Sequence, residues 1–112
     1  MRLFLSILFV AFAIQLSAQQ NLDIYFTVQV AAAKNPIAKT NKMFGDMPNL
    51  EEVQGEDGYY RYFTGNFKAY HSAEDYLKRV KSMGYDDAFV LAINNGSERI
   101  PADKAIELIY GQ

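Results

Sequence analysis

The sequence contains no cysteine and only 1 histidine among its 112 residues. Without cysteine the chain can form no disulfide and offers no thiol nucleophile, and no lipid can be attached to a cysteine after its N-terminal apolar run. His71 lies in an expected loop, with no evident partners for a catalytic triad or for a metal site. Glycine-rich phosphate-binding motifs are also absent. The sequence therefore predicts a protein that is not an enzyme and has no metal or cofactor.

The chain also lacks an excess of positive charge, with 11 Lys+Arg against 13 Asp+Glu and a formal net charge of −2. Nucleic acid attracts basic proteins, so a nucleic-acid partner is disfavoured. Half of the residues are hydrophobic, and the length suits one small domain with a modest core rather than two. We therefore expect a single folded domain.

The longest apolar run lies at the N-terminus, at residues 3–14, behind the single basic residue Arg2. The run is shorter than the roughly 20 apolar residues that cross a bilayer, and it resembles a secretory signal peptide more than an uncleaved membrane anchor. Small residues precede the polar Gln19, which favours cleavage after Ala18. We expect residues 1–18 to be a cleaved signal peptide, and residues 19–112 to form an exported domain with its core at about 25–100 and no stable membrane anchor.

Alternation with a period of two predicts four β-strands in the exported part. They are expected at residues 24–32, 50–54, 59–67 and 87–93. The sequence GEDG at residues 55–58 is typical of a turn, so the second and third strands should form an antiparallel hairpin. A second turn at residues 94–96 should close the last strand.

Helical spacing and capping residues predict three helices. They are expected to begin at Asn35–Pro36, at Ser72 and at Pro101. The first should stop at Gly45 with Phe44 on its inner side, and the second should stop at Gly84. The buried stripe of the second helix should comprise Ala73, Tyr76, Leu77, Val80 and Met83, and the third should carry Ala102, Ala105, Ile106 and Ile109. The resulting order, βαββαβ plus a short C-terminal helix, predicts an α+β fold of the ferredoxin-like or RNP-like type.

The chain resembles itself at an offset of 34 residues, which suggests two related strand–helix halves. The matching pairs are Phe26 with Tyr60, Val28 with Tyr62, Val30 with Thr64, and Lys34 with Lys68. With one register for both halves, the helices should cover Val28, Val30, Tyr60, Tyr62 and Thr64. The opposite face of the sheet should be uncovered and should present Gln29, Tyr59, Arg61, Phe63 and Phe89.

The segments VQVAAA, YYRYFTGNF, SAEDYLKRVKSMGYDDAFVLA and NGSERI resemble the SPOR domain of bacterial cell-envelope proteins, over residues 25–100. The family's signature joins V-Q-V-G-x-F on one strand to R-V-x-V-G-x-F on another, followed by a helix with A-x-x-x-L and a terminal glycine. The corresponding residues are Val28, Gln29 and Val30, residues 61–67, Ala73 with Leu77, and Gly84. Three positions depart from the pattern: Ala31 replaces the usual glycine, Ala33 the usual phenylalanine, and Asn66 a frequent proline.

The resemblance implies a four-stranded antiparallel sheet, backed by helices on one face, that binds peptidoglycan glycan strands stripped of their stem peptides. It implies a non-catalytic module of the periplasm or cell envelope, the division septum included, with cell-wall enzymes or division proteins as further candidate partners. The glycan-binding residues that it implies are Gln29, Ala32, Tyr59, Arg61 and Phe89, and Phe63 shares their expected face. Sugar rings present apolar C–H faces to aromatics, and an arginine such as Arg61 can bind the lactyl carboxylate of a stripped muramic acid with two hydrogen bonds.

Two other interpretations use the same face of the sheet. RNA-recognition domains share the strand order, but export, the net negative charge and the absence of their aromatic motif in RYFTGNF disfavour that function. A protein-interaction module of the cell envelope, using the exposed aromatics against a partner protein, stays open as the alternative.

Overall fold

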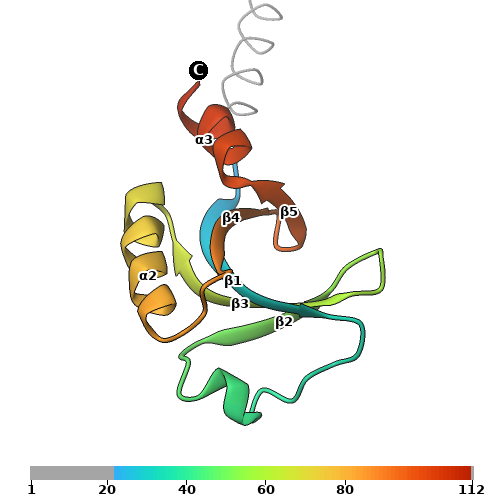
Figure 1. Ribbon diagram of the computed structural model, residues 1–112. Helices are drawn as coiled ribbons and strands as arrows, with labels where there is room; N and C mark the ends of the chain where they lie inside the picture. Colours follow the sequence, from blue (N-terminus) through green and yellow to red (C-terminus); the bar gives the residue numbers. More distant parts are fainter. Residues whose placement is uncertain (1–21, 112) are drawn as a thin grey trace, which may run out of the picture.

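The computed structural model describes residues 22–111, which form a five-stranded antiparallel sheet with two α-helices (Figure 1). The strand order in the sheet is β2-β3-β1-β4-β5. The elements are β1 (Ile24–Ala33), the 3-10 helix η1 (Lys42–Phe44), β2 (Leu50–Gln54), β3 (Tyr60–Phe67), α2 (Tyr70–Ser82), β4 (Phe89–Asn94), β5 (Glu98–Pro101) and α3 (Ala102–Tyr110). The α+β class, the four expected strands and the β2–β3 hairpin are confirmed. The expected signal peptide and its cleavage site lie outside the described residues.

The sheet was expected to have four strands and has five, because a fifth strand, β5, follows the turn after β4. It pairs with β4 from Asn94 opposite Glu98 to Leu91 opposite Pro101. Asn95 and Gly96 take positive φ angles of 52° and 82° in the connecting turn, which reverses the chain tightly. Four residues are too few to show a strand period in the sequence, so β5 is defined by its pairing with the edge of β4.

The helix expected at residues 35–45 was also wrong, because the chain there forms a loop with the single 3-10 turn η1. The loop is held on the sheet by Tyr62: the Ile37 amide donates to the Tyr62 hydroxyl at 2.6 Å, and that hydroxyl donates to Glu52 at 2.8 Å. Phe44 is only 2% exposed and packs against Tyr62 at a tilt of 40°, with ring centroids 5.1 Å apart. The apolar stripe of the expected helix was thin, so the helix had little apolar area to bury against the sheet. A loop that buries the single aromatic ring of Phe44 forms in its place.

Helix α2 begins at Tyr70, two residues before the expected cap Ser72, and no side chain caps its N-terminus. It ends as expected before Gly84, whose φ of 108° turns the chain out of the helix. Ala73 and Val80 are fully buried, but Met83 is 53% exposed because it lies at the C-cap, beyond the last turn that faces the sheet. Among the described residues, no helix has the length and apolar character needed to span a membrane.

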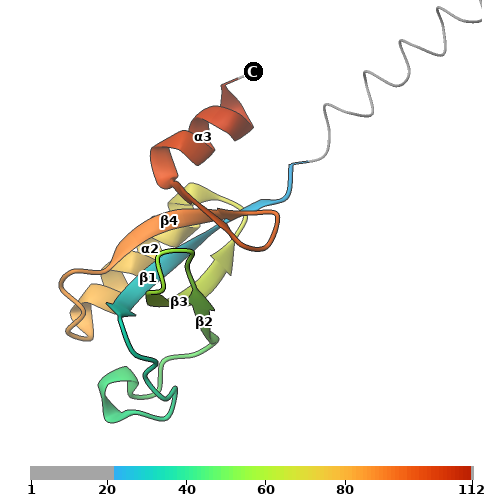
Figure 2. The same ribbon diagram turned by 90° about the vertical axis from the view of Figure 1, so that its right-hand side faces the viewer.

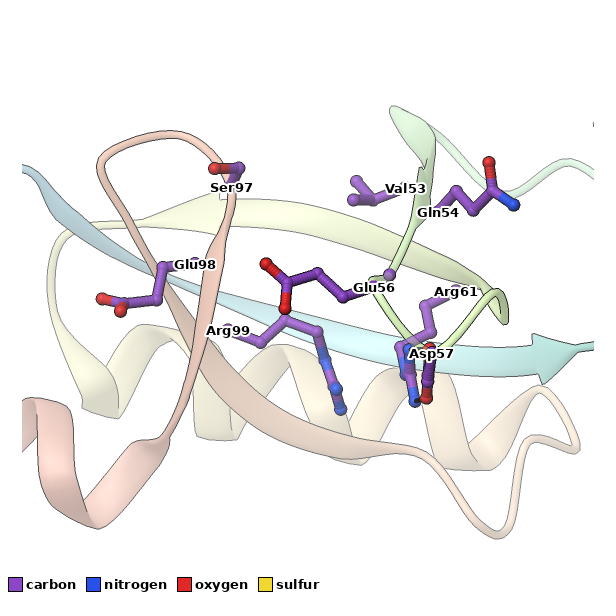
Figure 3. Close-up of a pocket in the computed structure, with 9 residues that line it drawn as sticks. Val53, Gln54, Glu56, Asp57, Arg61, Ser97, Glu98 and Arg99 are labelled. Carbon is purple, nitrogen blue, oxygen red and sulfur yellow. Dashed lines mark hydrogen bonds and ion pairs between the residues drawn. The ribbon is translucent and has the colours of Figure 1, made fainter.

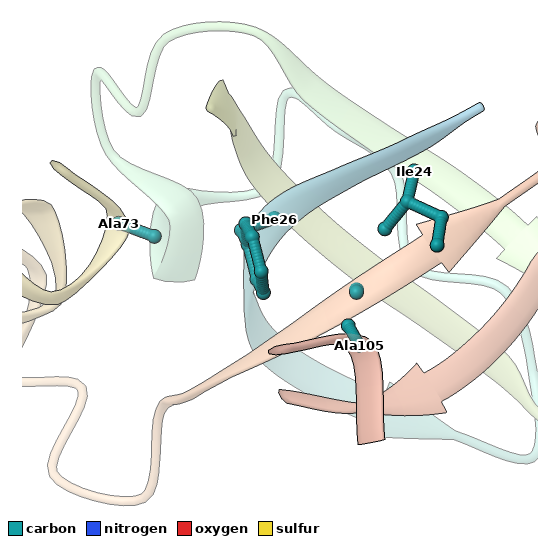
Figure 4. Packing of buried hydrophobic residues seen from close by; sticks show 5 residues of the cluster. Ile24, Phe26, Ala73 and Ala105 are labelled. Atoms are coloured by element: carbon teal, nitrogen blue, oxygen red, sulfur yellow. The ribbon is translucent and has the colours of Figure 1, made fainter. Parts of the chain in front are cut away.

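Two apolar clusters hold the helices against one face of the sheet. Phe26 and Ile24 of β1 point toward Ala73 of α2 and Ala105 of α3 (Figure 4). A second cluster joins Val28 to Val80 of α2 and includes Val30. Helix α2 crosses β1, β3 and β4, whereas α3 covers β4 and β5. The inward parity expected for Val28, Tyr62 and Thr64 is therefore confirmed, with the η1 loop rather than a helix covering Tyr62.

The opposite face of the sheet is concave. Figure 1 shows the sheet curving, and in Figure 2 α2 lies behind the sheet while the β2–β3 and β4–β5 turns stand on the viewer's side. A third apolar cluster of Phe63, Leu91 and Ile93, joined by Tyr25 and Val53, forms the floor of this face. The curvature places two hairpins on either side of a hollow.

Candidate functional site

A groove of about 660 Å³ lies between the two hairpins (Figure 3). One side is formed by residues 53–57 at the tip of the β2–β3 hairpin together with Arg61, and the other by Ser97, Glu98 and Arg99. Arg61 and Arg99 point into the groove from opposite sides (Figure 3). Two guanidinium groups in one groove make it a candidate site for a polar, acidic ligand.

Arg61 is engaged by its own hairpin. Its two terminal nitrogens donate to the two carboxylate oxygens of Asp57 at 3.0 and 2.7 Å, and its guanidinium lies 5.8 Å from the centre of the Tyr59 ring. Asp57 also accepts from the Tyr59 amide at 3.1 Å. The hydrogen bond from Arg61, followed by that from Tyr59, lowers the pKa of Asp57 from 3.8 to about 2, while the same bond to Asp57 raises the pKa of Arg61. The carboxylate that Arg61 would bind in a ligand is thus already supplied by the turn.

The Asp57–Arg61 pair makes a pH-dependent contribution to stability. Because folding lowers the pKa of Asp57, the contribution is complete above about pH 4, the unfolded value, and is lost as the pH falls through about 2. Asp57→Asn should therefore unfold at a lower temperature than the wild type near neutral pH, and the two melting temperatures should converge as the pH approaches 2. The shift should be modest, because the Asp57 side chain is 51% exposed.

Thermal unfolding monitored by circular dichroism at several pH values measures this effect. Glu56→Gln is the control, since it removes a charge from the same turn without removing an ion pair among residues 22–111. A gap between wild type and Asp57→Asn that stays constant down to pH 2 would show that the ion pair does not form in solution.

Arg99 differs from Arg61 in its partners. It lies on β5 opposite Ile93, and its Nη2 donates to the side-chain oxygen of Gln29 at 3.2 Å. Partial burial, and next the charge of Arg61, lower the pKa of Arg99, with Asp57 acting in the opposite direction. Arg99 forms no ion pair with any residue that the structure describes. It was missed in the sequence because no strand was expected between the turn at residues 94–96 and Pro101, and the four residues of β5 are too few to show a strand period.

The expected site residues lie together on the concave face. Gln29 is directly opposite Phe63 on one side and Phe89 on the other, and Ala32 is opposite Arg61. A β-bulge between Gln29 and Ala31 shifts the register, so that Gln29 and Ala32 share a face although they are three residues apart. Tyr59 precedes β3 beside Arg61.

The expectation that this face is uncovered holds for only part of it. Phe89 is 44% exposed, but Phe63 is 3% and Gln29 is 8% exposed. The curvature of the sheet brings Phe63 against Leu91 and Ile93, so its ring forms the floor and has little area for stacking. Phe89 instead borders a second hollow of about 310 Å³, which Arg99 and Pro101 also line.

His71 has no catalytic or metal-binding surroundings. Its side chain is 84% exposed on α2 and lies 3.5 Å from Asp75 of the same helix. Within residues 22–111, no three His, Asp or Glu side chains come close enough together to hold a metal ion. The concave face is therefore the site on which a function can be argued.

Comparison with protein families matches the SPOR domain over residues 11–92, which is more than half of the chain. The match starts within the segment expected to be a signal peptide and ends in β4, before β5 and α3. No curated protein and no solved structure matches the chain. SPOR domains are generally non-catalytic, bind peptidoglycan and occur in cell-envelope and division proteins. The chain therefore belongs to the SPOR domain family.

Proposed function

We propose that this protein is a non-catalytic module of the cell envelope that binds peptidoglycan glycan strands lacking stem peptides, along the groove between the β2–β3 and β4–β5 hairpins. The observation that carries the proposal is the concave face, where amide, carboxylate and guanidinium groups line the groove and Arg99 joins the groove to a second hollow bordered by the exposed ring of Phe89. The apolar cluster of Phe63, Leu91 and Ile93 belongs to the same face. Sugars offer the complementary pattern of apolar C–H faces and polar hydroxyls.

Each expected residue has a role that suits its position. Phe89 is the stacking residue, because its ring is exposed. Gln29 lies between Phe63 and Phe89, is only 8% exposed, and positions Arg99 through its side-chain oxygen, while the small Ala32 leaves room beside Arg61. Arg61 and Tyr59, held by Asp57, form the rigid wall of the β2–β3 side, and Phe63 supports the floor.

The two hairpins also provide a reason for selecting stripped strands. A stem peptide is attached to the lactyl group of each muramic acid, so it would have to leave the groove between the hairpin tips. Residues 54–57 stand on one side of that exit and Ser97 and Glu98 on the other. A strand without peptides avoids this crowding and keeps a free carboxylate that a guanidinium group of the groove can bind.

A sedimentation assay with purified protein tests the proposal. Retention should be high on amidase-treated sacculi, lower on intact sacculi, and low on chitin, which has no lactyl carboxylates. Equal retention on all three would contradict glycan-strand recognition. Retention on none of them would favour the alternative, a module that binds a partner protein with the same face.

Phe89→Ala should lower the affinity for stripped glycan about two- to tenfold, the effect of losing one aromatic contact. The matched control is Tyr110→Ala, which removes another exposed aromatic, 63% exposed, from α3. Binding of fluorescent glycan fragments measures both variants. Equal affinities for Phe89→Ala and the wild type would remove Phe89 from the site.

A further inference from the structure

The groove contains two arginines, and only one of them has a carboxylate partner among the described residues. Arg61 donates to both oxygens of Asp57. Arg99 makes a hydrogen bond with the neutral amide oxygen of Gln29. A guanidinium has five N–H donors, so most of the donors of Arg99 remain available to a ligand.

The other acidic residues lining the groove do not neutralise Arg99. Glu98, its neighbour on β5, accepts a hydrogen bond from Asn94 at 2.9 Å. Glu56 lines the opposite side and forms no ion pair within residues 22–111. Among the charges around Arg99, the like charge of Arg61 has the largest effect on its pKa and lowers it, and the charge of Asp57 acts in the opposite direction but less strongly. A partly desolvated cation beside another cation is a favourable position for an anion.

Arg99 also lies where two hollows meet. It lines both the polar groove between the hairpins and the smaller hollow bordered by Phe89, Leu91 and Pro101. The smaller hollow offers an exposed aromatic ring and a proline ring, which suit the apolar face of a sugar. A ligand placed here would set an acidic substituent on Arg99 while its sugar ring rests against Phe89.

We infer that Arg99, and not Arg61, is the carboxylate-binding residue of the groove, and that it selects a sugar acid whose ring lies against Phe89. This inference rests on the proposed function and names the group that is recognised: the free lactyl carboxylate of a stripped muramic acid. Arg99 lies beyond residue 92, where the match to the SPOR family ends, so the inference is argued from the geometry of this chain alone.

The test compares stripped glycan fragments with the same fragments whose carboxylates have been reduced to alcohols. The wild type should bind the reduced glycan about ten- to 100-fold more weakly, the effect of losing a charge-assisted pair of hydrogen bonds. Arg99→Gln should lose a similar factor with native glycan and should no longer distinguish the two forms. Arg61→Gln should weaken both forms by one common factor and should keep the discrimination.

Two controls secure the comparison. Arg79→Gln removes an exposed arginine from α2, on the opposite face of the sheet, and should bind both glycans as the wild type does. Circular dichroism should show that Arg99→Gln keeps its fold, as expected for an exposed residue of a strand edge.

The outcomes separate the two proposals. Equal binding of native and reduced glycan by the wild type would overturn the role of Arg99 and leave glycan binding intact. If Arg99→Gln still bound native glycan more tightly than reduced glycan and Arg61→Gln did not, Arg61 would be the carboxylate-binding residue. Binding of neither glycan by the wild type would overturn the proposed function and the inference with it.

Discussion

Phe26→Ala should lower the free energy of unfolding by about 3–5 kcal/mol, a large share of the stability of a small domain. Phe26 is 0% exposed and lies where β1 meets α2 and α3. Its ring meets Tyr70 of α2 edge-on, with the centroids 5.6 Å apart. Truncation would leave a cavity lined by Ile24, Ala73, Ala92 and Ala105, of which three are alanines that cannot extend to fill it.

Phe89→Ala is the matched control, because it makes the same chemical change on the opposite face of the sheet. Phe89 is 44% exposed, so its loss should lower the free energy of unfolding by only about 1 kcal/mol. Urea denaturation followed by circular dichroism measures both variants. Similar losses for the two variants would contradict the assignment of one buried and one open face.

Gly65→Ala should lower the free energy of unfolding by about 2–5 kcal/mol, from backbone strain and overpacking together. Gly65 has a φ of 92°, which is unfavourable for any residue with a Cβ atom. A Cβ at this position would lie 2.5 Å from the Phe67 ring and 3.1 Å from the Tyr76 ring. These rings pack against each other at a tilt of 49°, with centroids 5.3 Å apart, and join β3 to α2.

Gly84→Ala separates the two causes. Gly84 has a φ of 108°, but a Cβ there would meet nothing within 4 Å. The free energy of unfolding of this variant should fall by about 1–2 kcal/mol, the cost of a positive φ angle for a residue with a Cβ atom. The difference between the two variants in urea denaturation is the steric cost at Gly65, and equal losses would show that the Phe67 ring moves aside freely.

The expectation of two related strand–helix halves was wrong, because no α-helix follows β1, and the contrast between Gly65 and Ala31 gives a reason. In the second half, the glycine lets Phe67 fold back onto Tyr76, and a helix follows. In the first half, Ala31 and Ala33 continue the strand β1, and no large side chain anchors a helix after it. The departures were visible in the sequence, but Pro36 and the spacing of Ile37 and Phe44 still favoured a helix. Tyr62 instead holds this segment as a loop, because its hydroxyl accepts a hydrogen bond from the Ile37 amide and its ring packs against Phe44.

Parity along the strands was predictable, whereas exposure was not. Phe63 and Phe89 were expected on the same face, and both are opposite Gln29. Strand alternation reports only the side to which a residue points. The curvature of the sheet then buries Phe63 to 3% exposure and leaves Phe89 at 44%. The candidate stacking residue is therefore Phe89.

The sequence by itself determined the α+β class, the β2–β3 hairpin, the helix α2 and the inner face of the central strands, because these depend on local periodicity, turn residues and the glycine that ends the helix. Only the tertiary structure decided that β5 pairs with β4 and that a loop replaces the first helix. It also decided that Asp57 forms an ion pair with Arg61 and that Arg99 lies across the groove from Arg61. These features depend on contacts between segments far apart in the chain. A strand of four residues or a charge pair across a turn has no periodic signal, and its energy comes from the neighbours that the fold supplies.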